Sequence, residues 1–287
     1  MVADSLFPSR IPAWTVLLLM GGFLLAAGCT PSSQATAPLG TEIVIFIDFS
    51  ESIGKKDRAL FEQDIAKWIV PSLSPGDRIL IAPINDKTLT DFRPLVEATF
   101  PPRPEFNGWL DNVLQYNRRV KDIDSQVARL KDTIRAQVAE MFARRYSSQR
   151  TDILSSLLIA QKLFHNEPRR KVLVLMSDMI EDYPPYRFDK IPWSPATTQK
   201  ILSELDAKGS IPNLSGVCVY VSGASARSAD LAENIGRFWQ AYFQRTEADM
   251  DPSRYAHVLL HWPPSESCHL DKRQSSVPEA LDSGGDG

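Results

Sequence analysis

Short, uninterrupted runs of apolar residues alternate along this chain with longer segments whose apolar residues recur every three or four positions. An uninterrupted apolar run of this length is typical of a strand that is buried on both faces of a sheet. We expect such strands at residues 43–48, 78–84, 171–177, 217–222 and 257–262, and an edge strand at residues 95–100.

The segments between these runs have the spacing that marks one apolar face of an amphipathic helix. We expect helices at residues 57–70, 120–146, 153–164, 198–208 and 229–245. The near-heptad stripe of the 120–146 helix could pair with a partner helix, but packing on the sheet of the same domain is the commoner cause. Proline-bearing loops at residues 101–119 and 183–195 interrupt the alternation, and we interpret the first as an insertion.

Alternation of strands and helices predicts an α/β fold, with a doubly wound, mainly parallel sheet and helices on both of its faces. In such a fold, ligands bind at the carboxyl ends of the strands, near the point where the strand order reverses. The loops after the first strand and after the 171–177 strand are therefore the first places to look for a site.

The N-terminus carries a different pattern. Residues 11–28 are almost entirely apolar, Arg10 precedes them, and small residues lead up to Cys29. This predicts a cleaved export signal, and the end of the run resembles a bacterial lipobox, which implies that Cys29 is acylated and becomes the first residue. The alternative is an uncleaved membrane helix, for which ~18 apolar residues suffice. Both interpretations place the rest of the chain outside the cytoplasm.

We therefore divide the chain into a signal peptide at residues 1–28, a flexible tether at 29–40, a domain at 41–262 and a disordered tail at 263–287. The tether is rich in proline, serine and alanine, whereas the tail is polar and lacks periodicity. We expect a lipid-anchored protein of the cell envelope, facing the periplasm or the cell surface. A net charge of −3 gives no basic field, so nucleic acid is not an expected partner.

Two further cysteines, Cys218 and Cys268, follow in the exported part of the chain. Cys218 lies inside a predicted buried strand, where a free thiol packs as a small apolar group. A disulfide between the two is the alternative in an oxidising compartment. Because Cys268 lies in the polar tail, we expect a buried, inert thiol at position 218.

The strongest chemical signal lies in three loops at the predicted strand ends. Asp48, Ser50 and Ser52 follow the first strand, Thr151 stands at the start of a helix, and Asp178 follows the 171–177 strand. All five offer hard oxygen ligands, which suit Mg²⁺ or Mn²⁺. Hydroxyl ligands add coordination without adding charge, so the metal retains its attraction for one more carboxylate.

In these five residues the chain resembles the von Willebrand factor type A family and its relatives in integrins. The resemblance covers residues 41–262 and implies a Rossmann-like fold with a metal-ion-dependent adhesion site. It also implies a non-enzymatic function, in which an Asp or Glu of another protein completes the coordination of the metal. The chain departs from the family at Met179, where glycine is usual, and no clear helix follows the last predicted strand. An open–closed switch is therefore not expected.

Other interpretations of these residues remain open. Ser, Thr and Asp also favour helix caps and turns. A Mg²⁺-dependent phosphohydrolase of the haloacid dehalogenase type has a similar set of residues, but it needs a second acid two positions after the nucleophile, and position 50 is serine. A third alternative is a scaffold lipoprotein with an unused metal site. The remaining acids of these loops are expected to be solvated carboxylates: Glu51, Asp86, Asp152, Glu181 and Asp182.

Overall fold

The computed structural model describes residues 40–86, 88–106, 108, 112–144, 146, 148–265 and 268. Residues Pro38–Gly287 form a compact unit by themselves. The predicted signal peptide, Cys29, nearly all of the tether and most of the tail lie outside the described residues. Within the described part of the chain, no helix is both long enough and apolar enough to cross a membrane.

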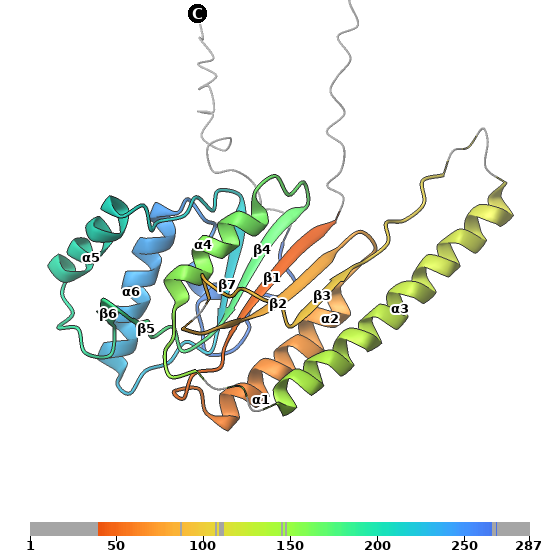
Figure 1. Cartoon of the computed structure of the whole chain (residues 1–287). Helices are drawn as coiled ribbons and strands as arrows, with labels where there is room; N and C mark the ends of the chain where they lie inside the picture. Colours follow the sequence, from red (N-terminus) through yellow and green to blue (C-terminus); the bar gives the residue numbers. More distant parts are fainter. Residues whose placement is uncertain are drawn as a thin grey trace, which may run out of the picture. The chain divides into compact units, whose positions relative to one another are not determined.

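A five-stranded sheet forms the centre of the domain, in the order β3-β2-β1-β4-β7 (Figure 1). Its strands are β1 (Thr41–Asp48), β2 (Arg78–Ile84), β3 (Val96–Thr99), β4 (Arg170–Met176) and β7 (Val217–Ser222). All neighbouring strands are parallel except the edge pair β2 and β3, which is antiparallel. The predicted fold class and edge strand are thereby confirmed, and the strand order reverses at β1.

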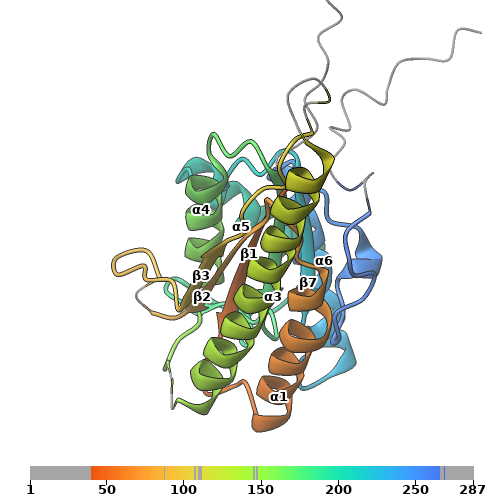
Figure 2. The same cartoon turned by 90° about the vertical axis from the view of Figure 1, so that its right-hand side faces the viewer.

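Helices cover both faces of this sheet (Figure 2). One face carries α3 (Val113–Ala143) and α1 (Lys55–Asp64), which continues through a π-helical turn (Ile65–Ile69) into α2 (Val70–Ser72). The opposite face carries α4 (Ile153–Phe164), α5 (Pro195–Ala207) and α6 (Ala229–Arg245). Alternate residues of β1 serve the two faces, with Phe46 packing toward α4 and Ile45 toward α1. This explains why the strands read as uninterrupted apolar runs.

Two expectations about element bounds are wrong. Helix α3 begins at Val113, inside the segment that we interpreted as irregular, because Asn112 caps it and its side chain accepts from Leu114 N. The second error is the strand at residues 257–262, which does not form. A short hairpin of β5 (Asp182–Tyr183) and β6 (Tyr186–Arg187), and a single turn at Pro252–Arg254, were not foreseen.

The free edge of β7 is instead lined by the chain that follows α6. Val219 N donates to Asp249 O at 3.0 Å, and Gly223 N donates to His257 O at 2.9 Å. The edge position is thus filled before residue 258 is reached. Leu259 and Trp262 then pack against the core on the α1 face, which explains the apolar pattern that suggested a strand.

The same return of the chain brings Cys268 to Cys218, and the two form a disulfide with a Cα–Cα distance of 5.7 Å. The expected free thiol at position 218 is therefore wrong. Arg254 is buried beside the disulfide, where its guanidinium contacts both sulfur atoms and pairs with Asp249 at 3.0 Å. A polar sequence around Cys268 gave no sign of this contact, because it depends on the path of the chain after α6.

Candidate metal centre

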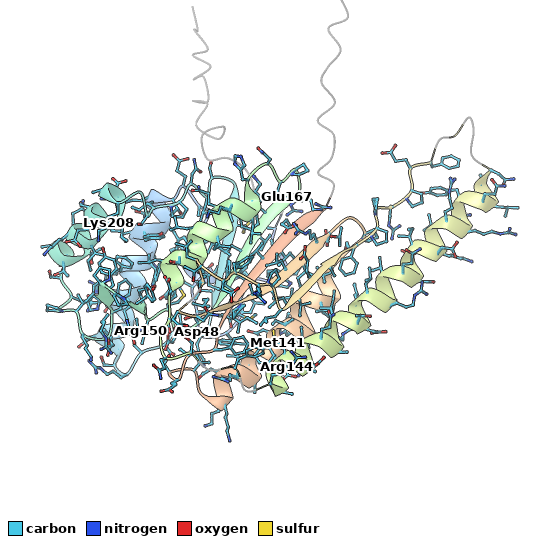
Figure 3. All side chains as sticks on the ribbon, viewed as in Figure 1. Asp48, Met141, Arg144, Arg150, Glu167 and Lys208 are labelled. Carbon is cyan, nitrogen blue, oxygen red and sulfur yellow. A yellow bond between two sulfur atoms is a disulfide. The ribbon has the colours of Figure 1, made fainter. Side chains whose placement is uncertain are left out.

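Asp48, the last residue of β1, is the centre of a buried polar cluster at the carboxyl end of the sheet (Figure 3). Its Oδ1 accepts from Ser50 N at 2.8 Å, and its Oδ2 accepts from Ser177 Oγ at 2.9 Å. The Thr151 hydroxyl also bonds to this carboxylate. Burial raises the pKa of Asp48, and the hydrogen bonds from Ser50, Ser177 and Thr151 offset part of that effect.

Asp178 follows β4 and lies beside Asp48. Burial, and after it the negative charge of Asp48, raise the pKa of Asp178 to about 7, while a hydrogen bond from the Ser52 hydroxyl acts in the opposite direction. Ser52 Oγ in turn lies 2.9 Å from Ser50 Oγ. The structure therefore brings together all five residues that the sequence singled out: Asp48, Ser50, Ser52, Thr151 and Asp178.

The alternative role for these hydroxyls, as helix caps, does not agree with the geometry. Helix α4 is capped by Asp152, whose side chain accepts from Ser155 N at 3.0 Å. The cap of α1 is Gly54. Thr151 is thus turned toward Asp48 instead of toward the helix that it precedes.

The cluster fits a divalent cation on the chemistry of its donors. Asp48 and Asp178 are only 0% and 7% exposed. Among the described residues, no basic side chain forms an ion pair with either of them. Buried like charges raise each other's pKa and destabilise the metal-free fold. A divalent ion would relieve this repulsion, and the three hydroxyls supply further oxygen ligands of the kind that Mg²⁺ and Mn²⁺ accept.

Met179 occupies the position after Asp178 where the resemblance implies a glycine. Its φ is +67°, a left-handed conformation that glycine adopts more easily than any other residue. The backbone therefore takes the conformation that a glycine would favour. Trp239 holds it there by donating from Nε1 to Met179 O at 2.8 Å, and Met179 N donates to Ser177 Oγ at 3.0 Å.

Glu181 was expected to be a solvated loop carboxylate, and this is wrong. It is 1% exposed, and its Oε2 accepts from Ile153 N at 2.8 Å and from Leu154 N at 3.1 Å. Burial raises the pKa of Glu181 well above its usual value, and these amide groups at the start of α4, which favour a negative charge, offset only part of that effect. Since Asp182 N also donates to Thr151 O at 3.0 Å, the loop after β4 fixes the backbone of Thr151.

The other acids of these loops differ among themselves. Asp152, the cap of α4, is buried, which again contradicts the expected solvated state. Glu51 and Asp86 are exposed as expected. Asp182 is half-buried and pairs with Arg187 at 2.9 Å. Burial of capping acids escapes sequence analysis because caps and surface loops use the same residue types.

Arg58 of α1 is a second positioning residue that the sequence analysis missed. Its guanidinium donates to Phe49 O at 3.0 Å, to Ser50 O at 3.4 Å and to Tyr146 O at 3.1 Å. It thus ties the loop after β1 to the segment after α3. An arginine on an amphipathic helix usually lies on the solvated face, so its sequence context carried no signal.

In the described part of the chain, two clefts border segments that adjoin the cluster in sequence or by hydrogen bonds. One, of about 510 Å³, lies between α1 and the end of α3 and is lined in part by Lys55, Arg58 and Arg144. The other, of about 410 Å³, is lined by Asp86, Arg150, Tyr183 and Pro184. The start of the proline-bearing loop at residues 183–195 thus borders one of these clefts. The proline-bearing segment at residues 101–106 lies elsewhere, because it accompanies the beginning of α3 at the other end of the sheet (Figure 1).

A second group of potential ligands, Cys218, Asp249 and Cys268, has ligand atoms within 4.8 Å of one another. In the disulfide form neither sulfur is a thiolate, and the thiolate is the form that binds metals. The positive charge of Arg254 also lies directly against both sulfurs. The cluster around Asp48 is therefore the better candidate.

No family model and no curated protein matches the sequence. Solved structures of similar fold include the manganese-loaded TRAP protein of Plasmodium vivax, at 14% identity and a TM-score of 0.38, over 70% of this chain and 63% of that one. They also include the conserved hypothetical protein BatB of Bacteroides thetaiotaomicron, at 14% identity and a TM-score of 0.37, over 64% and 66%.

A third similar structure is the pilus adhesin SpaC of Lactobacillus rhamnosus GG in its open conformation, at 12% identity and a TM-score of 0.40, over 76% of this chain and 27% of that one. The chain thus spans less than two thirds of the length of each of these three proteins. Similarities this distant carry no information about function, so the function has to be inferred from the chain's own residues.

Proposed function

We propose that this chain is a lipoprotein of the cell envelope whose domain binds Mg²⁺ or Mn²⁺ and uses the ion to bind a carboxylate of another protein. The ligands are Asp48, Ser50, Ser52, Thr151 and Asp178. The observation that carries the proposal is the pair of buried aspartates, without a basic partner among the described residues, surrounded by three hydroxyls.

The chain's own groups have distinct parts in this function. Asp48 and Asp178 supply two negative charges, which balance a divalent ion and leave it able to attract one more carboxylate. The hydroxyls contribute oxygen without further charge. Ser177 and Arg58 hold the carboxylate and the loop in place. When bound, the ion supplies an electrophilic site for a partner's Asp or Glu.

An enzymatic function has less support in this geometry. Phosphohydrolysis of the haloacid dehalogenase type needs a general acid two residues after the nucleophilic aspartate, and Ser50 Oγ, hydrogen-bonded to Ser52, cannot protonate a leaving group at neutral pH. We therefore propose a binding module and not an enzyme.

Capture of the partner by the immobilised protein tests the metal-dependent function. Binding should require Mg²⁺ or Mn²⁺ and be weaker with Ca²⁺, whose longer bonds suit a compact, hydroxyl-rich site less well. Thr151→Ala should weaken capture, whereas Thr133→Ala, which removes an exposed hydroxyl from α3, should not. Capture that is undiminished in EDTA would show that the metal does not mediate binding.

Lipid anchoring rests on the sequence before Cys29 and has its own test. Cys29→Ser should abolish lipid labelling and leave unprocessed precursor. A variant that still matures to a chain beginning near Thr30 would replace the lipoprotein with a protein exported by an ordinary signal peptide.

A further inference from the structure

Helix α3 is much longer than the sheet on which it packs. The ring of Phe142, near its end, contacts the ring of Phe49, just after β1, with 5.7 Å between centroids. From Phe142 back to Val113 the helix is about 44 Å long, at 1.5 Å per residue. From Phe49 back to Thr41, at the start of β1, the strand is only about 26 Å long. The first turns of α3 therefore project past the start of the strands (Figure 1).

This projection, which we call the arm, consists of residues 101–106 and residues 113–123 of α3. Arg103 pairs with Asp124, and the ring of Phe106 meets that of Tyr116 at 5.1 Å, so the two segments lie against each other. The apolar stripe of α3 runs from Ile123, which still packs against the core, to the exposed residues at the start of the helix.

The end of the arm exposes apolar side chains that nothing in the described part of the chain covers. Farther along α3, Val127 and Ile134 are buried in the core. Val113 and Leu114, by contrast, are 58% and 68% exposed, and Phe106 is 47% exposed. Exposed basic residues follow within the next two turns: Arg118, Arg119 and Lys121.

We propose that the arm docks on the surface of an anionic phospholipid membrane. This inference rests on the lipid anchor that we propose at Cys29. The chain enters the domain at Gly40, at the start of β1, which is the end of the sheet past which the arm projects. Ten residues lie between Cys29 and Gly40, and the eleven peptide steps from one to the other can span at most about 40 Å.

An anchored domain therefore stays within reach of the bilayer at the end that carries the arm. Apolar side chains beside basic ones are the combination that binds an anionic membrane surface. Docking would orient the metal centre, at the opposite end of the sheet, away from the membrane and toward a partner. Charge and position thus favour lipid over a second copy of the chain as the occupant of this surface.

The test uses a chain in which a histidine tag replaces residues 1–29, held on vesicles of phosphatidylethanolamine, phosphatidylglycerol and a nickel-chelating lipid. Because Cys218 and Cys268 form a disulfide, Leu114→Cys provides a single thiol for an environment-sensitive fluorophore. A matched label at the exposed Gln149, near the metal centre, is the control.

We expect the emission of the Leu114 label to shift to the blue on vesicles and to be quenched by nitroxide-labelled lipid, while the Gln149 label does neither. The shift should be lost with Phe106→Asp and Val113→Asp, and reduced with Arg118→Glu and Lys121→Glu. Identical behaviour of the two labels overturns the proposal, as does a shift that appears without vesicles and grows with protein concentration. The tag holds the chain without Cys29, so failure of the lipid anchor is detected separately, by flotation of the full chain and its Cys29→Ser variant.

Discussion

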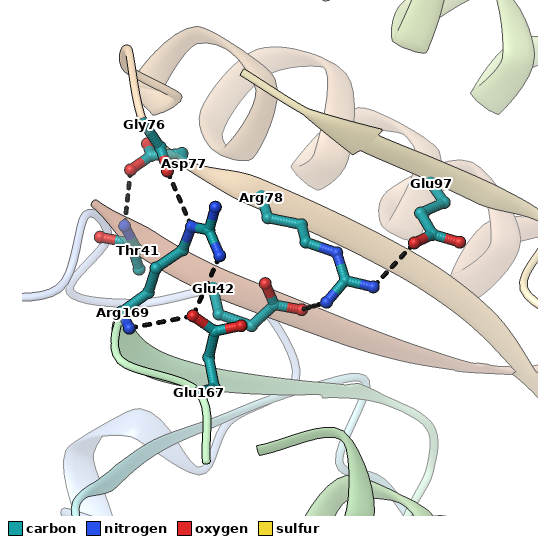
Figure 4. A network of polar contacts seen from close by, with 8 residues as sticks. All are labelled: Thr41, Glu42, Gly76, Asp77, Arg78, Glu97, Glu167 and Arg169. Carbon is teal, nitrogen blue, oxygen red and sulfur yellow. Dashed lines mark hydrogen bonds and ion pairs between the residues drawn. The ribbon is translucent and has the colours of Figure 1, made fainter. Parts of the chain in front are cut away.

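Glu42 lies at the opposite end of β1 from Asp48, in a network of polar contacts (Figure 4). Its side chain is fully buried, and its Oε1 accepts from Arg78 at 3.1 Å. Arg78 also donates a hydrogen bond to Glu97 Oε1 at 2.7 Å. The other carboxylate oxygen of Glu42, Oε2, is buried without a hydrogen-bond partner. Burial, only partly offset by Arg78, raises the pKa of Glu42 from 4.5 to about 7.

This shift has a definite sign. Because the pKa is higher in the folded than in the unfolded chain, the folded state holds a proton that the unfolded state has lost between about pH 4.5 and pH 7. Stability is therefore lost as the pH rises through this window, by at most about 3 kcal/mol. Relaxation of the folded chain and access of water beside the partly exposed Arg78 relieve some of the desolvation of Glu42, so we expect about 2 kcal/mol.

Glu42→Gln keeps the shape of the side chain and an oxygen that can accept from Arg78, but it cannot ionise. Denaturant unfolding in EDTA should give nearly equal free energies for wild type and variant at about pH 5, and a variant that is more stable by about 2 kcal/mol at about pH 8. Taking the difference between the two proteins cancels the contributions of Asp48 and Asp178. A difference that does not change with pH would refute the reasoning.

Three further predictions concern other parts of the molecule. Arg58→Ala should lower the affinity for Mg²⁺ about tenfold, because charge-assisted hydrogen bonds to the loop after β1 are lost. As a control, Arg135→Ala, which replaces an exposed arginine of α3, should leave the affinity measured by calorimetry unchanged. Cys268→Ser should lower the free energy of unfolding by about 3–4 kcal/mol, since the disulfide closes a long loop, and an unfolding midpoint that is indifferent to reductant would contradict this. Metal affinity should fall as the pH drops below the value of about 7 at which Asp178 takes up a proton, and equal affinities at about pH 6 and pH 8 would exclude it.

Much of the fold follows from apolar patterning. The strands β1, β2, β4 and β7 are uninterrupted apolar runs because each is covered on both faces, so their positions could be predicted to within a residue or two. The run at residues 257–262 is also largely apolar, with His257 and His261 as its polar residues, yet it forms no strand. The backbone from Asp249 onward already forms the hydrogen bonds along the free edge of β7. A local apolar pattern does not show which of two segments will occupy an edge.

The candidate site likewise has a part that could be predicted from the sequence and a part that could not. Its five oxygen donors could be found because each stands at a strand end or a helix start, where the fold class itself places a site. The residues that hold these donors in place could not be found from the sequence. Glu181, Arg58 and Trp239 bind backbone atoms of residues that are distant in the sequence, and only the folded chain shows those contacts.

The most direct test of the metal centre is a calorimetric titration of the mature chain with Mg²⁺ and with Mn²⁺. We expect one site in the wild type, loss of measurable binding in Asp48→Ala, and a smaller loss in Ser50→Ala, which removes a neutral ligand. Asp48→Ala should remain folded, because removing one of two buried carboxylates relieves repulsion in the metal-free protein. Equal metal binding by the wild type and a folded Asp48→Ala would contradict the assignment of the site.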